Sequence, residues 1–148
     1  AAVIARRDLD VAGDFAIGHY THEKNPVTTR AGLTTLEIIR DEDLVARTAS
    51  LGAAAMSHLH ERLDRCPIVG DIRGRGLMFG VAIVCDRDAR TPDPETAERI
   101  FYRCLGEGLS FKISAGNVLT LSPPLVISRE DLTRAMEIVV SAIEAEAA

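Results

Sequence analysis

The sequence has few of the residues on which disulfide-stapled and zinc-binding domains depend. Its 148 residues include three cysteines, Cys66, Cys85 and Cys104, which are widely spaced and form no CxxC pair. An odd, scattered set of cysteines argues against a disulfide framework and a zinc ribbon, and it favours the reducing cytoplasm. Apolar runs are also short, and none approaches the length that a membrane-spanning helix needs. We therefore expect a cytoplasmic protein with no membrane partner.

Lysine is the scarcest charged residue. Only two of the 17 basic residues are lysines, Lys24 and Lys112, and the formal net charge is −5. Nucleic-acid binding depends on clustered Lys and Arg that neutralise phosphates, so this balance predicts no nucleic-acid partner. The scarcity of lysine also limits any chemistry that needs a reactive amine.

The beginning of the chain lacks a methionine and any recognisable leader. AAVIARRD has no charged region ahead of its short apolar run, which is unlike a signal peptide. We interpret it as a chain that begins in the middle of a protein. Hydrophobic residues make up 47% and charged residues 26%, which is typical of a folded globular domain. The length allows one domain, or one small domain with a piece of another.

What is present is an alternation of helical and strand patterns. Asn25 can cap a helix that begins at Pro26, and Ser128 with Asp131 suggests a capping box for the last helix. The patterns predict helices over 27–40, 42–63, a segment opened by 91–95, and 128–145, with strands over 68–73, 77–85, 109–113 and 118–121. This order predicts an α+β fold in which a small sheet packs with helices.

The segment GRGLMFG, residues 74–80, resembles the glycine pattern of dinucleotide-binding loops. That pattern needs a helix next, because the N–H groups at the helix start receive the pyrophosphate. Residues 81–84 are Val-Ala-Ile-Val instead, and they favour a strand. We therefore expect Gly74 and Gly76 to form a strand-to-strand turn that requires positive φ.

The histidines do not form a ligand set with metal spacing. His58 and His60 are two positions apart on a predicted helix, so they point in different directions. His19 and His22 have no Cys or carboxylate ligands at suitable spacing. There is also no GxSxG elbow and no cysteine in an activating context. The sequence thus predicts neither a metal site nor a catalytic nucleophile in this chain.

The stretch GHYTHEKNPVTT, residues 18–29, gathers hydrogen-bonding side chains just before a predicted helix. Thr21 lies four residues before Asn25, where a turn can bring its hydroxyl to the positive end of the helix dipole. A phosphate there would gain a hydroxyl donor and backbone N–H donors. The other interpretation is a plain turn, since turns commonly use such residues.

Four segments, in their order and spacing, resemble the C-terminal third of class III (fold type I) pyridoxal-phosphate-dependent aminotransferases. These segments are AAVIARRD, HYTHEKNP, GDIRGRGLMFGVAIV and NVLTLSPPLVIS. HYTHEKNP and LTLSPPL are most similar to the branch with dialkylglycine decarboxylase and the ammonia-lyases that act on hydroxylated aminoethylphosphonate. The resemblance implies that residues 1–45 end a large cofactor domain and that residues 46–148 form the small C-terminal domain.

The resemblance also implies a cofactor-binding role for Thr21. In this family the corresponding threonine hydrogen-bonds the phosphate of the pyridoxal 5'-phosphate held by the other subunit, so a homodimer with a shared phosphate site is implied. The family's Schiff-base lysine lies upstream of the segment that matches AAVIA, and neither Lys24 nor Lys112 matches it. We expect the chain to be inactive by itself, because pyridoxal catalysis needs that amine.

Thr120 stands where many members of the family carry an arginine that grips the substrate carboxylate. A threonine cannot supply a forked cation, so the resemblance implies a substrate-binding position with an altered preference. A primary amine with a phosphonate, a phosphate or no nearby carboxylate becomes the favoured substrate.

The function implied by the resemblance is transfer of an amino group from an amine donor to an oxo acid. Two alternatives remain open. One is an ammonia-lyase that acts on a hydroxylated aminoethylphosphonate, which the threonine at position 120 favours. The other is a non-catalytic α+β interaction domain without a cofactor.

Overall fold

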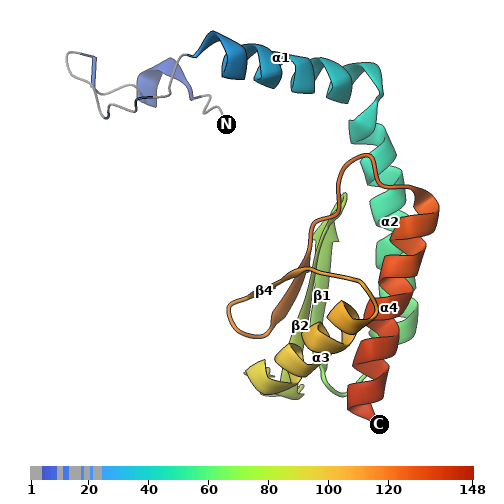
Figure 1. Cartoon of the computed structure of the whole chain (residues 1–148). Coiled ribbons are helices and arrows are strands. Elements are labelled where there is room, and N and C mark those ends of the chain that lie inside the picture. Colours follow the sequence, from blue (N-terminus) through green and yellow to red (C-terminus); the bar gives the residue numbers. More distant parts are fainter. Residues whose placement is uncertain (1–4, 10–11, 14–17, 19–20, 22–24) are drawn as a thin grey trace. The chain divides into compact units, whose positions relative to one another are not determined.

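The computed structural model of the chain describes residues 5–9, 12–13, 18, 21 and 25–148 (Figure 1). The chain divides into two compact units, Ala1–Glu42 and Asp43–Ala148. The first unit contains a short 3-10 helix, η1 (Arg7–Leu9), and the helix α1 (Pro26–Asp41). The assignment of residues 1–45 to the end of a large cofactor domain stays a prediction.

The helix α1 begins where Asn25 and Pro26 predict. The side-chain oxygen of Asn25 accepts a hydrogen bond from the N–H of Val27 at 2.9 Å, and Pro26 occupies the first helical position, where a missing N–H costs nothing. No side chain of α1 is buried against the described residues, and Leu36 is 65% exposed. The cap and local helix propensity therefore define α1 within its own unit.

The second unit alternates helices and strands. Its elements are α2 (Leu44–Leu63), β1 (Val69–Arg75), β2 (Met78–Asp86), β3 (Thr91–Pro92), α3 (Pro94–Gly106), β4 (Lys112–Ser114), β5 (Val118–Leu121) and α4 (Arg129–Ala147). The predicted α+β class is confirmed. The strand expected over 109–113 is wrong at its start, because the ladder with β5 begins only at Lys112. The two-residue strand β3 had no strand signal in the sequence.

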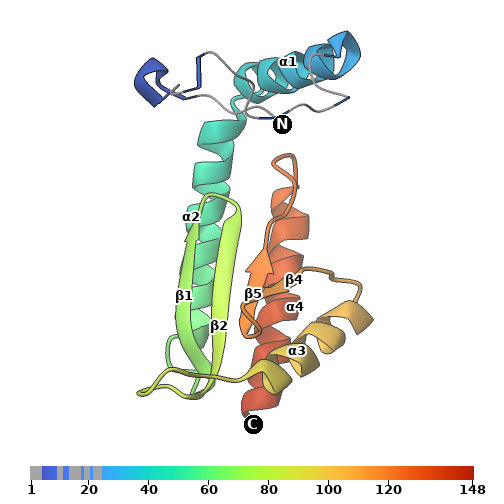
Figure 2. The same cartoon turned by 90° about the vertical axis from the view of Figure 1, so that its left-hand side faces the viewer.

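The sheet is antiparallel throughout, with strand order β1–β2–β5–β4 and with β3 paired to the end of β2. Figures 1 and 2 show α2 and α4 side by side against one face of this sheet. The helix α3 packs against α4 and contributes to the same core. No helix of the unit Asp43–Ala148 lies on the other face, which is turned toward the viewer in Figure 2. We call these two faces the covered face and the open face.

The alternation of side chains along the strands fills the covered face. Phe79, Val81 and Ile83 of β2, with Leu119 and Leu121 of β5, are each 3% exposed or less. Side chains alternate along a strand, so the intervening residues lie on the open face. The helices contribute Leu59, Leu63, Ile100, Met136 and Val139 to the same core. Among the described residues, every helix is too short or too polar to span a bilayer.

The hairpin between β1 and β2 turns at Gly76. Gly76 has φ +56°, as predicted. The turn also lies close to α2, since a Cβ at Gly52 of α2 would lie 2.0 Å from the Gly76 carbonyl oxygen. The prediction is wrong for Gly74, which lies inside β1 and has no positive φ. A Cβ at Gly74 would lie 2.6 Å from the carbonyl oxygen of Met78, so this glycine permits close packing and not a turn.

Side-chain caps define the beginnings of α3 and α4. The carboxylate of Asp93 accepts hydrogen bonds from the N–H and the hydroxyl of Thr96, at 3.0 and 2.7 Å, and these bonds lower the pKa of Asp93. At α4 the Ser128 hydroxyl oxygen accepts from the N–H of Asp131 at 2.9 Å, as expected. The Asp131 carboxylate, however, accepts from the Ser128 hydroxyl at 2.7 Å and not from its backbone N–H. This start is therefore a simple cap, and the predicted capping box is wrong in its reciprocal bond.

Candidate functional site

Thr21 lies in a turn ahead of α1, and its side chain is exposed. The neighbouring residues 19–20 and 22–24 lie outside the described part of the chain. An exposed hydroxyl can donate a hydrogen bond to an anion, which is what a phosphate ligand requires. The cofactor-binding role of Thr21 stays a prediction.

The start of α1 differs from the anion site that the sequence suggests. Pro26 has no N–H, and the N–H groups of Val27 and Thr28 point to the side-chain oxygen of Asn25, at 2.9 and 3.5 Å. The N–H of Thr29 donates to the Asn25 carbonyl at 3.0 Å. The expectation of open backbone donors for a phosphate is therefore wrong, because the asparagine that starts the helix already binds them.

Two features of this unit could bind the phosphate of pyridoxal phosphate. They are the Thr21 hydroxyl and the positive end of the α1 helix dipole. Both favour an anion, and neither opposes one. A phosphate group accepts several hydrogen bonds, so these features fit the cofactor as one part of a phosphate site.

Thr120 is half-buried and lies on the open face of the sheet, in β5. Its hydroxyl donates a hydrogen bond to the Ser114 hydroxyl of β4 at 2.9 Å. Lys112 is exposed and lies directly opposite Thr120 in the β4–β5 ladder. Side chains of directly opposite residues lie on the same face, with Cβ atoms about 4.5–5.5 Å apart. The uncharged position 120 therefore has a cation as its cross-strand neighbour.

The same row continues on the other side of Thr120. Gly80 of β2 pairs with Thr120, and Arg73 of β1 pairs with Gly80. Arg73 leans over the glycine, since a Cβ on Gly80 would lie 3.7 Å from Arg73 Cγ and 3.9 Å from its Nε. Arg73 also forms an ion pair with Asp71 of the same strand. We call the set Arg73, Gly80, Thr120 and Lys112 the transverse row.

Sequence reasoning identified Thr120 but missed the two cations of the transverse row. Lys112 could have been found locally, because the connection 115–117 pairs Ser114 with Val118. Two residues further from this turn on each strand, Lys112 lies opposite Thr120. Arg73 could not have been found in this way. Its place depends on the pairing of β2 with β5, which are far apart in the sequence.

A cavity of about 520 Å³ opens beside β4 and the end of β5. Thr120 and Lys112 line it, together with Ser122 and Pro124 of the loop that follows β5. Most of the remaining lining is apolar and belongs to the segment before β4 and to α4, with Phe111 and Met136 among its largest side chains. An apolar cavity with a few polar groups at one side is typical of a small-molecule site.

Arg47 of α2 holds the loop that borders this cavity. Its guanidinium group donates hydrogen bonds to the carbonyl oxygens of Leu125, at 2.6 Å, and of Ile127. A forked side chain can bind two carbonyls of one loop at once. The loop is therefore fixed by a contact from a helix far away in the sequence.

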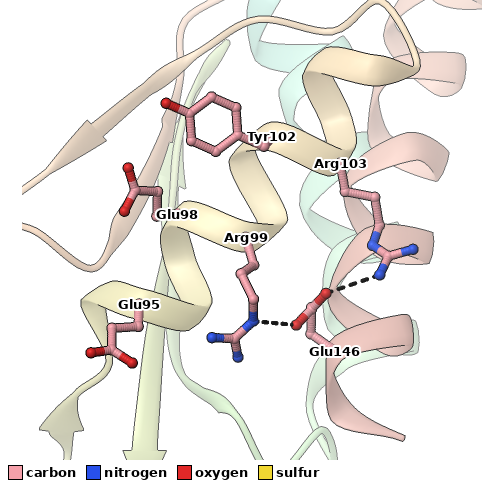
Figure 3. Close-up of a pocket in the computed structure, with 6 residues that line it drawn as sticks. All are labelled: Glu95, Glu98, Arg99, Tyr102, Arg103 and Glu146. Atoms are coloured by element: carbon pink, nitrogen blue, oxygen red, sulfur yellow. Dashed lines mark hydrogen bonds and ion pairs between the residues drawn. The ribbon is translucent and has the colours of Figure 1, made fainter.

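Another cavity, of about 720 Å³, lies between α3 and α4 and is lined by neither Thr21 nor Thr120. Figure 3 shows Arg99 and Arg103 of α3 pointing toward Glu146 of α4. Their nitrogen–oxygen distances are 2.8 and 3.0 Å, and the two hydrogen bonds lower the pKa of Glu146. These ion pairs hold α3 and α4 together, so we assign them a structural role and do not include this cavity in the candidate site.

The remaining candidate groups carry no catalytic arrangement. Within the described residues, no group of three or more His, Cys, Asp or Glu could hold a metal ion. His58 lies 3.1 Å from Glu137 and His60 lies 2.8 Å from Asp64, so they have different carboxylate neighbours. Burial raises the pKa of the Cys104 thiol to about 11, which keeps it protonated and unreactive near neutral pH.

Comparison with known proteins identifies the family of this chain. The Aminotransferase class-III family model matches residues 1–143. The (R)-1-hydroxy-2-aminoethylphosphonate ammonia-lyase of Vibrio splendidus is 43% identical over 97% of this chain and 30% of the relative. Two racemases, an epimerase and an omega-aminotransferase are also similar in sequence.

Solved structures agree with the sequence comparison. A Bacillus anthracis aminotransferase superposes with a TM-score of 0.76 at 36% identity, over 82% of this chain and 28% of that chain. A phospholyase from Arthrobacter in complex with phosphoethanolamine gives a TM-score of 0.74 at 31% identity, over 82% and 29% of the two chains. This chain thus spans about 30% of the length of the relatives it matches. The chain belongs to the class-III aminotransferase family, whose members depend on pyridoxal phosphate.

Proposed function

We propose that the complete protein uses pyridoxal phosphate to remove the amino group from a small primary amine that carries an acidic group. Family membership supports the cofactor and the general reaction. The pair Thr120 and Lys112 carries the choice of substrate, because a hydroxyl and a separate ammonium stand together on the open face. A forked guanidinium would suit a planar carboxylate, whereas this pair favours a phosphonate or a phosphate.

The removed amino group has two possible fates. We place release as ammonia first, because the 43% identical relative is named for that reaction and because Thr120 replaces the expected arginine. Transfer to an oxo acid is the second candidate, supported by the family and by the similarity to a solved aminotransferase. Family membership disfavours the remaining alternative, a non-catalytic interaction domain.

In this proposal, the residues of this chain bind the cofactor and the substrate and orient them. Pyridoxal phosphate, when bound, withdraws electrons from the carbon that carries the amine, which both fates require. Thr21 donates a hydrogen bond to the phosphate of the cofactor held by a second subunit of a homodimer. Thr120 and Lys112 bind the acidic group of the substrate, while Arg47 holds the loop beside them. We assign no proton transfer to a residue of this chain.

Product analysis distinguishes the two fates. The complete, cofactor-loaded protein is incubated with a hydroxylated aminoethylphosphonate, with and without pyruvate. Ammonia released without pyruvate supports elimination, whereas alanine formed in amounts equal to the consumed amine supports transfer. If the loaded protein forms neither product from this substrate or from a panel of small amines, the proposal is wrong.

The role of Thr21 has its own test. We expect Thr21→Ala to weaken cofactor binding by about 1.5–3 kcal/mol, the contribution of a hydrogen bond to a charged group. Cofactor retained after dialysis is measured by its absorbance. Thr35→Ala is the matched control, because the Thr35 hydroxyl donates to the Ala31 carbonyl within α1. Equal retention by wild type and Thr21→Ala would remove Thr21 from the phosphate site.

A further inference from the structure

We propose that the transverse row, Arg73–Gly80–Thr120–Lys112, is a binding site for a tetrahedral oxyanion. Its ligand is the phosphonate or phosphate group of the amine substrate. The identity of this ligand rests on the proposed function. The anion site rests on the register, the charges and the glycine of the open face.

The register places all four positions on one line. Each neighbouring pair in the row is a direct cross-strand pair, so the four positions share one face of the sheet. Neighbouring strands lie about 4.7–4.9 Å apart, which separates the Cα atoms of Arg73 and Lys112 by roughly 14 Å. The long cationic side chains lie at the two ends, and the short residues lie between them. An anion above the middle of the row therefore has a cation on each side.

The two cations retain donors for a ligand. Among the described residues, Lys112 forms no ion pair with a carboxylate. Arg73 uses its Nη1 to bind Asp71, and within the described part of the chain its Nε and Nη2 have no such partner. The Arg73 side chain is 59% exposed, and Lys112 is also exposed. The row thus has an excess of positive charge, which attracts anions.

Gly80 is buried, and its lack of a side chain lets Arg73 lie close over the middle of the row. A Cβ there would contact Val118 Cγ1 at 3.4 Å and Arg73 Cγ at 3.7 Å. Gly80 does not have a positive φ, so its backbone conformation suits any residue. The backbone does not require this glycine. The close approach of the Arg73 side chain over this position explains it better.

The central hydroxyls suit a tetrahedral group. Thr120 donates its hydrogen to Ser114, and the Ser114 hydroxyl then has its own hydrogen to donate to a ligand. A phosphate group carries a charge of about −1.5 to −2 at pH 7 and presents three acceptor oxygens. Separate donors on several strands can reach those oxygens from different directions. A planar carboxylate would leave some of these donors unused.

Binding of methylphosphonate tests the site without requiring turnover. The complete protein is loaded with pyridoxal phosphate, so the cofactor phosphate site is filled, and Kd is measured by calorimetry. We expect Lys112→Met to weaken binding about tenfold, the effect of losing one hydrogen bond between charged groups, and Lys112→Arg to stay within about threefold of wild type.

Arg65→Met is the matched control for net charge. Arg65 is exposed in the turn after α2 and lies outside the transverse row. Its replacement should leave the Kd of methylphosphonate unchanged. Equal weakening in Arg65→Met and Lys112→Met would overturn the proposal, because it would show a nonspecific effect of charge. Loss of bound cofactor in Lys112→Met would also overturn it, by assigning Lys112 to the cofactor.

Kinetics on two amines separates this inference from the proposed function. For 1-hydroxy-2-aminoethylphosphonate, we expect Lys112→Met to raise KM about tenfold with kcat nearly unchanged, since uniform binding is lost. For ethanolamine, which lacks the acidic group, KM should not change. If wild type converts no amine but binds methylphosphonate through Lys112, the proposed function is wrong and the anion site stands. If wild type is active and neither Kd nor KM changes in Lys112→Met, the anion site is wrong.

Discussion

Phe79 and Gly80 are neighbours in β2, yet Phe79 packs in the core under the helices, whereas Gly80, although also buried, lies on the open face beneath the Arg73 side chain. Leu119 and Thr120 show a similar contrast one strand away, where Leu119 is fully buried in the core and Thr120 is half-buried on the open face. The covered face holds the apolar contacts with three helices, and the open face holds hydroxyl groups and cations. Substitutions should therefore divide by face, with large effects on stability on one side and effects on binding on the other.

The largest effect is expected for Phe79→Ala on the covered face. Removing a fully buried aromatic ring leaves a cavity and should lower the free energy of unfolding by about 3–5 kcal/mol. On the open face, Thr120→Val should cost about 1 kcal/mol or less, the net contribution of one hydrogen bond. Thermal unfolding of the complete protein measures both. Similar losses of stability in the two variants would contradict the expected difference between the two faces.

Two glycines of the segment GRGLMFG provide a matched pair. A Cβ at Gly74 would lie 2.6 Å from the Met78 carbonyl oxygen and 3.1 Å from Met56 Sδ, so Gly74→Ala should destabilise by about 1–3 kcal/mol. Gly80→Ala meets only ordinary contacts and should unfold near the wild-type temperature. We expect Gly80→Ala instead to weaken methylphosphonate binding, because its methyl group lies against Arg73 and narrows the space beside that guanidinium group. The reverse pattern would contradict both assignments.

Acidic pH should weaken the contact between α3 and α4. Hydrogen bonds from Arg99 and Arg103 lower the pKa of Glu146, so its carboxylate stabilises the fold above the unfolded pKa, near the ordinary 4.5. That contribution is lost as the pH falls through the lower pKa of the folded state. The melting temperatures of wild type and Glu146→Gln should therefore differ at pH 7 and converge in acid. A difference that stays constant down to acidic pH would contradict this role.

The smallest effect is expected for Asp71→Asn on the open face. The ion pair between Asp71 and Arg73 is exposed, so its loss should change stability by about 1 kcal/mol or less. Removing the negative charge leaves Arg73 unneutralised beside the middle of the transverse row. We expect the affinity for methylphosphonate to rise severalfold, as measured by calorimetry at low salt. A weaker affinity would mean that Asp71 positions Arg73 and does not compete with the anion.

Local sequence patterns predicted most of the fold. Asn25 with Pro26 located the start of α1, and the alternation in residues 118–121 matched β5, because caps and strand alternation act over a few residues. Gly76 was identified for the same reason, since a tight turn imposes its φ locally. Gly74 was misread because its restriction comes from contacts within the packed hairpin and from α2, and not from the turn.

The site was less predictable, because it depends on pairing between distant segments. Thr120 was identified through a family resemblance, but its neighbours Gly80 and Lys112 became visible only with the strand register. The start of α1 was misjudged where two local effects compete, since Asn25 binds the N–H groups that a phosphate would need. The role of Thr21 stays a prediction.

A crystal structure of the complete, cofactor-loaded protein with methylphosphonate would test most directly whether the uncovered side of the sheet binds the acidic group of the substrate. We predict phosphonate oxygens within about 2.7–3.2 Å of Lys112 Nζ and close to the hydroxyl groups of Thr120 and Ser114. Methylphosphonate bound only at other positions, with the transverse row left without it, would contradict the assignment.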